Sequence, residues 1–237
     1  MFYLKKIYRY LKFAISKKRG LFYPKFQDEF YSFQQGYLRG NYKIINERQK
    51  IYIPYLLSLP KKIVSQLYFL DAGFGRGEFL DILKKSGIKK IVGVDTNNKS
   101  VNQAKKMGTY AINKDVNKYL YLTDKKFVGI SAFHLIEHMS FKYFFDFLIL
   151  SRDKLTDGGI LIMETPNVEN IIVGNTTFYY DHTHILKLPK LMIETVLKFV
   201  GFRKIKFIYL HPAKEKFDSK YDELLYGPQD LAIIAYK

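Results

Sequence analysis

Three glycines at alternate positions, Gly73, Gly75 and Gly77, follow an apolar segment that ends in Asp71. Glycine reaches backbone dihedral angles that are closed to other residues, so a ligand can approach the main chain where the next helix begins. The dinucleotide-binding motif G-x-G-x-x-G has its third glycine one residue later. An acid just before the first glycine would repel a pyrophosphate, but it suits a ligand with an α-ammonium group. The loop therefore predicts a site for S-adenosyl-L-methionine (SAM), with S-adenosyl-L-homocysteine as the product.

A second acid stands at the distance expected for contact with the ribose of such a ligand. Asp95 ends the second apolar run, 22 residues after Gly73, and a spacing of about 20 residues is typical of an acid that binds the ribose hydroxyls. Asp115, after the third run, is placed to bind the adenine amino group, or else is a solvated turn acid. His134 and Leu135, after the fourth run, are expected to line the pocket beside the methionine.

His134, Glu137 and His138 fall at i, i+3 and i+4. This spacing would place all three on one side of a helical turn, as in some metal sites. No third ligand is evident beside this turn, and methyl transfer does not need a metal, so we predict that none is bound. In the alternative interpretation the residues are structural, and Glu137 and His138 cap the helix and orient one another.

A second polar group, Tyr180, Asp181, His182 and His184, lies in the long connection after the fifth predicted strand. Long loops at the carboxyl edge of a parallel sheet are where substrate contacts concentrate. Transfer to a hydroxyl requires removal of its proton, and an imidazole with a pKa of about 6.5 suits that task at neutral pH. We predict His184 as the general base, with His138 as the second choice. Tyr180 and Asp181 are further catalytic candidates, and His182 is a candidate for substrate binding.

An anionic acceptor would need no base. A phosphate-type oxygen already carries negative charge, so the protein has to supply positive charge and hydrogen-bond donors instead. Arg39, Lys43 and Arg76 are the candidates for this role. A hydroxyl and a phosphorus-linked oxygen therefore both remain open as acceptors.

The elements that must position these residues alternate along the chain. Apolar runs predict seven strands, one ending near Leu70 and the others at 91–95, 110–113, 127–133, 160–164, 203–210 and 231–236. Helical periodicity predicts helices at 78–85, 140–154 and 189–199. This alternation predicts an α/β fold, a seven-stranded, mostly parallel, doubly wound (Rossmann-like) sheet with helices on both faces and the ligand at the carboxyl ends of the strands.

Composition narrows the class of protein. A chain of 237 residues with 48% hydrophobic content can bury one substantial core. The net charge of +17 would suggest a nucleic-acid partner, but the 39 basic residues include only 7 arginines, in no arginine-rich run, so we expect none. The absence of cysteine excludes disulfides and thiolate metal sites and is compatible with the cytoplasm. No apolar stretch reaches the roughly 18 residues of a membrane-spanning helix.

The amino terminus has a distinct character. Residues 1–20 carry seven basic side chains and no acid, with apolar residues at helical spacing. This segment is either an interfacial helix on anionic lipid, which would give peripheral contact with the inner membrane, or a helix packed on its own domain. We assign residues 1–36 to a basic amphipathic helical extension and 37–237 to the catalytic domain.

Several motifs beyond the glycine loop resemble those of a known family. They are Y-L-R-G at 37–40 with Arg48, H-L-I-E-H at 134–138, E-T-P-N at 164–167 and F-Y-Y-D-H-T-H at 178–184. Together they resemble SAM-dependent methyltransferases of bacterial surface-polysaccharide assembly, in O-antigen and capsule pathways, over roughly residues 37–210. The resemblance implies the methyltransferase fold and a nucleotide-linked or glycan acceptor. It also implies that Arg48 pairs with the methionine carboxylate of SAM.

The chain departs from this pattern at three positions. His182 replaces the usual proline, Phe74 stands where many methyltransferases carry cysteine, and Val128 stands where an acid is common. These departures bear on the identity of the acceptor rather than on the fold. Some members of the family methylate phosphate or phosphoramidate groups.

The sequence argues against three other functions. The positive charge invites RNA methylation, but amino-methylating nucleic-acid enzymes usually have an acid or Asn followed by Pro-Pro and an aromatic where this chain has His134 to His138. A non-catalytic SAM-binding scaffold is disfavoured by the intact loop and by Asp95. An NAD-dependent reductase is disfavoured by the glycine spacing and by Asp71.

Overall fold

The structure is a computed structural model, and it describes residues 30, 33–34, 36–38, 40–214 and 218–237. Within it, Tyr42–Lys237 forms one compact unit, and the fold below is that of this unit. The basic segment 1–20 and Arg39 lie outside the described residues, so the roles assigned to them stay predictions. The predicted boundary between residues 36 and 37 also stays a prediction.

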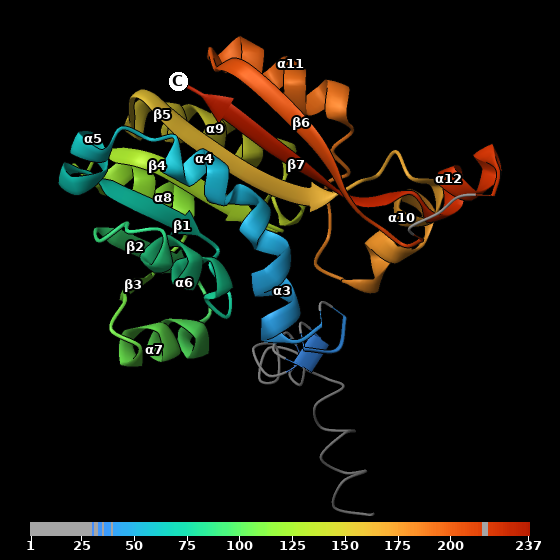
Figure 1. Ribbon diagram of the computed structural model, residues 1–237, viewed down its shortest axis with the longest axis horizontal. Helices are drawn as coiled ribbons and strands as arrows, with labels where there is room; N and C mark the ends of the chain where they lie inside the picture. The colour runs from blue at the N-terminus through green and yellow to red at the C-terminus, as the bar shows by residue number, and fades with distance from the viewer. Residues whose placement is uncertain (1–29, 31–32, 35, 39, 215–217) are drawn as a thin grey trace, which may run out of the picture. The chain divides into compact units, whose positions relative to one another are not determined.

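A seven-stranded sheet forms the centre of the unit (Figure 1). Its strands are β1 (Tyr68–Ala72), β2 (Ile91–Asp95), β3 (Tyr110–Asn113), β4 (Phe127–Phe133), β5 (Leu155–Pro166), β6 (Arg203–Pro212) and β7 (Pro228–Tyr236). They are arranged in the order β3-β2-β1-β4-β5-β7-β6, and only β7 runs antiparallel to its neighbours. The predicted α/β fold is therefore confirmed. The chain reverses its direction of travel across the sheet between β1 and β4, which is where ligands bind in such folds.

The last three strands are longer than predicted. β5 begins at Leu155 rather than Ile160, because Leu155 pairs with Phe127 before an irregularity in the β4–β5 register. β6 and β7 continue together until Pro212 pairs with Pro228. This antiparallel pair extends past the alternating apolar pattern, so the sequence pattern alone underestimates its length.

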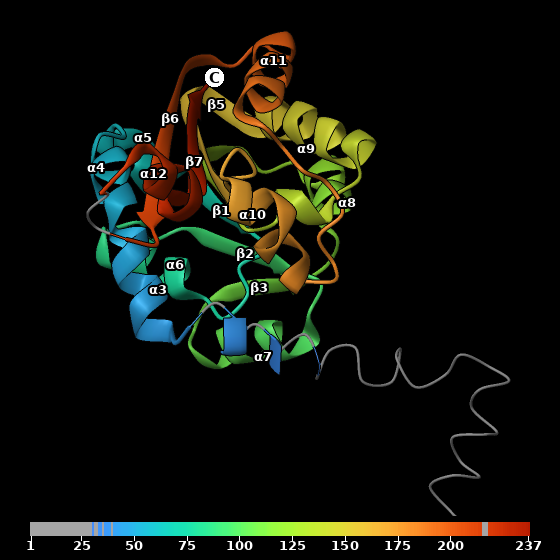
Figure 2. The ribbon, with the colours of Figure 1, turned by 90° about the vertical axis from the view of Figure 1, so that its right-hand side faces the viewer.

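Helices cover both faces of the sheet (Figure 2). One face carries η1 (Lys50–Tyr52), α4 (Ile53–Leu57), α5 (Lys61–Gln66), α6 (Glu78–Lys85) and α7 (Asn98–Lys106), and the other carries α8 (Val116–Leu122), α9 (Phe141–Lys154) and α11 (Lys190–Val200). Each face has its own apolar core, and β4 between them is buried along its whole length. A strand buried on both faces reads as a continuous apolar run, which is why β4 was predicted with its exact bounds.

Local signals explain where the main helices begin and end. α6 starts after Gly77, carries Glu78 in its first turn and Lys84 and Lys85 in its last, and so matches the helix dipole at both ends. α9 starts at Ser140, whose hydroxyl accepts a hydrogen bond from the backbone N–H of Tyr143 at 3.3 Å.

The remaining helices lie around the carboxyl edge of the parallel strands. α3 (Tyr42–Gln49) packs beside α6, and α10 (Ile171–Asn175), η3 (Thr177–Tyr180) and α12 (Lys220–Tyr226) lie beyond the ends of β5 and β7 (Figures 1 and 2). The short turn η2 (Ile136–His138) follows β4 directly. None of the helices among the described residues has the length and apolar character needed to cross a membrane.

The packing of α9 on the sheet gives a stability prediction. Leu148 is fully buried, whereas the adjacent Ile149 is 45% exposed. We expect Leu148→Ala to lower the free energy of unfolding by about 2–5 kcal/mol, because it leaves a cavity against the sheet. The control Ile149→Ala should change it by about 0.5 kcal/mol or less. Urea unfolding followed by circular dichroism measures both; equal losses would contradict this packing.

Candidate active site

The glycine loop joins β1 to α6 in the conformation that its sequence predicts. Gly73, Gly75 and Gly77 have φ angles of +65°, +54° and +86°, a region that side chains with a Cβ rarely adopt. At Gly73 a Cβ atom would also lie 2.8 Å from Cδ1 of Leu135. The loop thus needs glycine for its backbone angles, and at Gly73 also for the close approach of Leu135.

Asp95 ties this loop to the end of β2. Its Oδ2 accepts a hydrogen bond from the backbone N–H of Gly75 at 2.9 Å, and its Oδ1 accepts one from that of Asn97 at 2.7 Å. Burial raises the pKa of Asp95, and these N–H groups oppose that rise. Because a carboxylate oxygen can accept more than one hydrogen bond, both oxygens can still receive ribose hydroxyls. Asp95, which is predicted to bind the ribose, therefore also holds the glycine loop in place.

Asp71 is buried with an incomplete set of hydrogen bonds. Its Oδ1 accepts a hydrogen bond from the Ser131 hydroxyl at 2.7 Å, whereas its Oδ2 has no partner among the described residues. Burial raises its pKa to about 8, which the Ser131 hydrogen bond only partly opposes. An unpaired buried carboxylate oxygen is costly, and a cationic donor from a ligand, directly or through water, would relieve that cost. The residues present therefore fit a ligand with an ammonium group.

The other predicted cofactor residues lie in different surroundings. Leu135 packs against Gly73. Asp115 caps α8, where its Oδ1 accepts a hydrogen bond from the backbone N–H of Lys118 at 2.9 Å. Asp115 therefore has a structural role that a solvated turn acid would not have. Arg48, in the last turn of α3, is exposed. Burial lowers the pKa of His211, and the nearby charge of Arg48 lowers it further. Their contacts with SAM stay predictions.

Glu137 stands at the centre of a cluster that includes His134, His138 and His184. Its side chain is fully buried, and its Oε2 accepts a hydrogen bond from the Thr165 hydroxyl at 3.1 Å. Its backbone carbonyl accepts hydrogen bonds from the N–H groups of Ile185 and Leu186, at 2.9 and 3.0 Å. Burial raises the pKa of Glu137, but contact with His134 and the charges of three imidazoles lower it to about 2. Glu137 is therefore ionised, and its backbone holds the second histidine group against the first.

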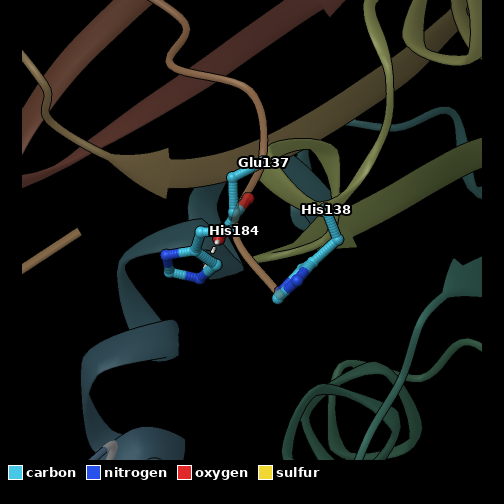
Figure 3. A group of neighbouring side chains, drawn as sticks. All are labelled: Glu137, His138 and His184. Atoms are coloured by element: carbon cyan, nitrogen blue, oxygen red, sulfur yellow. Dashed lines mark ion pairs between the residues drawn. The ribbon is translucent and has the colours of Figure 1, made fainter. Parts of the chain in front are cut away.

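His184 and His138 meet at this carboxylate (Figure 3). Nε2 of His184 lies 3.8 Å from Oε1 of Glu137, and the two imidazole rings are 4.7 Å apart between centroids. Nδ1 of His184 donates to the carbonyl oxygen of Phe178 at 2.7 Å. Nδ1 of His138 lies 2.8 Å from the hydroxyl oxygen of Thr183. The fold therefore brings together the two histidines that were candidates for the general base.

The backbone of His134 differs from the helical turn that the sequence predicts. Its φ of +47° interrupts helical geometry, so the predicted helical turn over His134, Glu137 and His138 is wrong at its first residue. The imidazole lies among three carboxylates, 3.2 Å from Glu137, 3.2 Å from Glu164 and 3.8 Å from Asp230. The contact with His134 lowers the pKa of Glu164, although burial acts in the opposite direction. A role beside the methionine of SAM stays a prediction.

The capping alternative for Glu137 and His138 is also wrong. Their turn is the short η2, which has no side-chain cap, and the following helix α9 is capped by Ser140. The structure further brings a third potential metal ligand to these two residues. Glu137, His138 and His184 each have one ligand atom within 4.8 Å of the others. The sequence did not reveal this group because His184 is 46 positions beyond His138.

The remaining predicted site residues are not drawn into the cluster to the same degree. Asp181 is buried and accepts a hydrogen bond from the Thr183 hydroxyl at 2.6 Å. Tyr180 is 57% exposed, and His182 lies 4.0 Å from Asp181 with a partly exposed ring. Arg76 pairs with Glu78 at 2.7 Å, and Lys43 is exposed on α3. Catalytic roles for Tyr180 and Asp181 and substrate binding by His182, Arg76 and Lys43 stay predictions.

Four residues of the cluster escaped the sequence analysis. Glu164 and Thr183 appeared there only within motifs, and no pattern pointed to Tyr52 or Asp230. The Tyr52 hydroxyl donates a hydrogen bond to Oε2 of Glu164 across 112 positions of sequence. Such contacts depend on the order of strands in the sheet, and only the T-H pair at 183–184 gave a local signal for the neighbourhood of Thr183.

The strand order, the glycine loop and the two acids together define a SAM-dependent methyltransferase, and comparison with known proteins agrees. A family profile described as a methyltransferase domain matches residues 44–206. A SAM-dependent methyltransferase from Archaeoglobus fulgidus is 28% identical, with a TM-score of 0.77, over 88% of this chain and 100% of that chain. The family match spans more than half of the sequence, so the chain belongs to the methyltransferase-domain family.

Two more distant structures share the fold. A SAM-dependent methyltransferase from Clostridium acetobutylicum is 13% identical over 89% of this chain and 98% of that chain, with a TM-score of 0.62. The phosphoethanolamine N-methyltransferase 2 of Haemonchus contortus, in complex with SAM, is 18% identical over 87% of this chain and 56% of that chain, with a TM-score of 0.63. A search of curated proteins found no match. The protein is a SAM-dependent methyltransferase, and SAM is its cofactor.

The crowding at Gly73 predicts a specific loss of cofactor affinity. Gly73→Ala forces a Cβ against Leu135, so we expect at least about a tenfold weaker affinity for S-adenosylhomocysteine, or about 1.4 kcal/mol. The control is Gly87→Ala, since Gly87 also has a positive φ, +83°, but its Cβ would meet nothing within 4 Å. Both variants carry similar backbone strain. Calorimetry should show near-normal affinity in the control, and equal losses would contradict the role of Leu135.

The raised pKa of Asp71 predicts proton release when SAM binds. Its folded-state value of about 8 exceeds the unfolded value of about 3.9, so at pH 7 the ligand-free protein holds this proton. A bound ammonium favours the carboxylate, so SAM should displace close to one proton at pH 7. Calorimetry in two buffers of different ionisation enthalpy measures it.

The same shift makes a linked prediction for stability. Because the folded pKa lies above the unfolded one, the ligand-free protein should lose stability as pH rises from about 4 to 8. Asp71→Asn should abolish both this slope and the proton release. If the release persists in the variant, another group is responsible.

Proposed function

We propose that this enzyme transfers a methyl group to an oxygen atom of a nucleotide-linked sugar or glycan intermediate in bacterial capsule or O-antigen assembly. The acceptor oxygen belongs to a sugar hydroxyl or to a phosphate or phosphoramidate group. The proposed reaction takes place in the cytoplasm, with peripheral contact at the inner membrane through residues 1–20 as an accompanying hypothesis.

The Glu137, His138 and His184 group is the observation that carries this proposal. It lies directly after β4, at the carboxyl edge of the sheet. Leu135, two residues before Glu137, packs on the glycine loop, so the group and the cofactor loop share one edge. A basic nitrogen beside a buried carboxylate suits the activation of an oxygen acceptor.

The bonding of His184 supports an acceptor-activating role. Because Nδ1 of His184 donates its proton to the carbonyl oxygen of Phe178, the lone pair resides on Nε2. Burial lowers the pKa of His184, which keeps the imidazole neutral. When SAM is bound it supplies the methyl group on a sulfonium sulfur, and displacement by the acceptor oxygen leaves a neutral thioether. For a hydroxyl acceptor, Nε2 of His184 accepts the hydroxyl proton as the oxygen attacks the methyl carbon.

The surface-polysaccharide assignment is supported by the motifs around this group. E-T-P-N at 164–167 supplies Glu164 and Thr165, which contact His134 and Glu137. F-Y-Y-D-H-T-H at 178–184 supplies Phe178, Asp181, Thr183 and His184. Residues that carry the resemblance thus lie together around the proposed acceptor position.

A panel of acceptors tests the proposal. Transfer of labelled methyl from SAM should reach nucleotide-linked sugars or their phosphate and phosphoramidate derivatives, and the new methyl should be found on oxygen by NMR. Transfer only to amines or to RNA would refute an oxygen acceptor. Absence of any transfer across the panel, with normal SAM binding, would refute this acceptor class.

Substitution of His184 tests the site. We expect His184→Ala to lower kcat by about 10²–10⁴-fold, the usual contribution of acceptor activation, with unchanged affinity for S-adenosylhomocysteine. The control is Ile185→Ala in the same segment, because the Ile185 side chain is 64% exposed and its backbone N–H is kept. Normal kcat in His184→Ala would contradict the role of this group.

A further inference from the structure

We propose that Glu137, His138 and His184 bind one divalent transition-metal ion and that this ion holds the acceptor oxygen. The role in catalysis rests on the proposed function, but metal binding itself does not. The proposal reverses the expectation from sequence that no metal is bound. It starts from the observation that three separate ligand atoms meet at one point of the carboxyl edge.

The distances suit a small cation. One ligand atom from each residue lies within 4.8 Å of the others, and Nε2 of His184 is 3.8 Å from Oε1 of Glu137. In a tetrahedral zinc site with bonds of about 2.0–2.1 Å, ligand atoms are about 3.4 Å apart. A separation of 4.8 Å, the upper bound here, would have to shorten by about 1.4 Å to complete such a site. Two imidazoles and one carboxylate are also the ligand set of catalytic zinc sites that keep a fourth position open.

Outer hydrogen bonds already set both imidazoles for coordination. Nδ1 of His184 donates to a backbone carbonyl at 2.7 Å. The Thr183 hydroxyl donates to Asp181 at 2.6 Å, so its oxygen accepts the proton of Nδ1 of His138 at 2.8 Å. In both rings Nε2 is left with the lone pair. Metal-binding histidines characteristically give their second N–H to a carbonyl or to a group linked to a carboxylate, which fixes tautomer and orientation.

Charge also favours a cation here. The Glu137 side chain is fully buried, and its Oε1 accepts no hydrogen bond of good geometry from the described residues. The nearest basic group to Oε1 is Nδ1 of His134, at 3.2 Å. A metal ion would give this oxygen a direct partner and offset its buried negative charge.

A neighbouring cluster is the weaker candidate. His134, Glu164 and Asp230 also place ligand atoms within 4.8 Å of one another. There, however, the imidazole of His134 lies between the carboxylates and already acts as their basic partner. The Tyr52 hydroxyl further occupies Oε2 of Glu164. These contacts already compensate the carboxylates of Glu164 and Asp230. The geometry therefore favours Glu137, His138 and His184 as the metal site.

A cation at this group would bind either proposed acceptor. It would attract a phosphorus-linked oxygen by charge, and it would lower the pKa of a coordinated hydroxyl so that its proton passes to water. The oxygen then forms a bond to the methyl carbon while the carbon–sulfur bond of SAM breaks, and sulfur keeps the electron pair. Nε2 of His184 is in that case a ligand and not a base.

Metal titration of the untagged full-length protein tests the inference. After treatment with a chelator, calorimetry with Zn²⁺ and visible absorption with Co²⁺ should both give one equivalent bound. His184→Ala and Glu137→Gln should weaken Zn²⁺ affinity by more than about 100-fold. Thr183→Ala, which removes only an outer partner, should weaken it by about 10–100-fold. His182→Ala is the control for histidine content and should leave Zn²⁺ affinity unchanged.

Folding and cofactor binding are checked separately. Each variant should retain its circular dichroism spectrum and its affinity for S-adenosylhomocysteine; if His184→Ala unfolds, Thr183→Ala still tests the site. Sub-stoichiometric binding, or equal affinity in wild type and His184→Ala, overturns the metal site while the proposed function can stand. One-to-one binding with no oxygen methylation of the acceptor panel refutes the proposed function and leaves the metal site established.

Discussion

The burial of Glu137 is the constraint on which the acceptor half of the site depends. An ionised carboxylate with no exposed surface persists only when neighbouring groups compensate its charge. Here the Thr165 hydroxyl donates a hydrogen bond to the side chain and Nδ1 of His134 lies 3.2 Å from it, while the backbone carbonyl binds two N–H groups of the segment after His184. One residue therefore fixes both the chemistry at this point and the course of the long connection between β5 and α11. Removing the carboxylate would leave imidazoles without their partner as well as a gap at the end of β4.

The second constraint is the antiparallel end of the sheet. β7 inserts between β5 and β6, and this brings Asp230 beside Glu164 and His134. The hydroxyl of Tyr52, in η1, donates a hydrogen bond to Glu164 and completes this group. These charges form an internal ion-pair network in which His134 is the basic member. The network is adjacent to Glu137, where Nδ1 of His134 and Nε2 of His184 approach the same oxygen, Oε1, at 3.2 and 3.8 Å.

The cofactor half of the site could be predicted from sequence because its determinants are local. Gly73, Gly75 and Gly77 dictate a turn within five residues, and Asp95 follows one strand later in the same βαβ unit. The acceptor half could not be predicted to the same extent. Glu137 and His184 meet only because β5 and its long connection return to the carboxyl edge, and no periodic pattern encodes that return. Even within the local segment, His134 has a left-handed backbone in place of the expected helical turn, and its imidazole contacts carboxylates of Glu164 and Asp230 that are distant in sequence.

The two ways of using His184 lead to different requirements for the acceptor. A free imidazole can take a proton from a hydroxyl, but it gives little help to an oxygen that is already anionic. Arg76, which lies within the glycine loop, is paired with Glu78, and its charge is therefore partly compensated. A metal ion at Glu137, His138 and His184 would instead supply positive charge to a phosphorus-linked oxygen and acidity to a hydroxyl. The same three residues would then serve both acceptor classes, which the sequence alone left as alternatives with separate machinery.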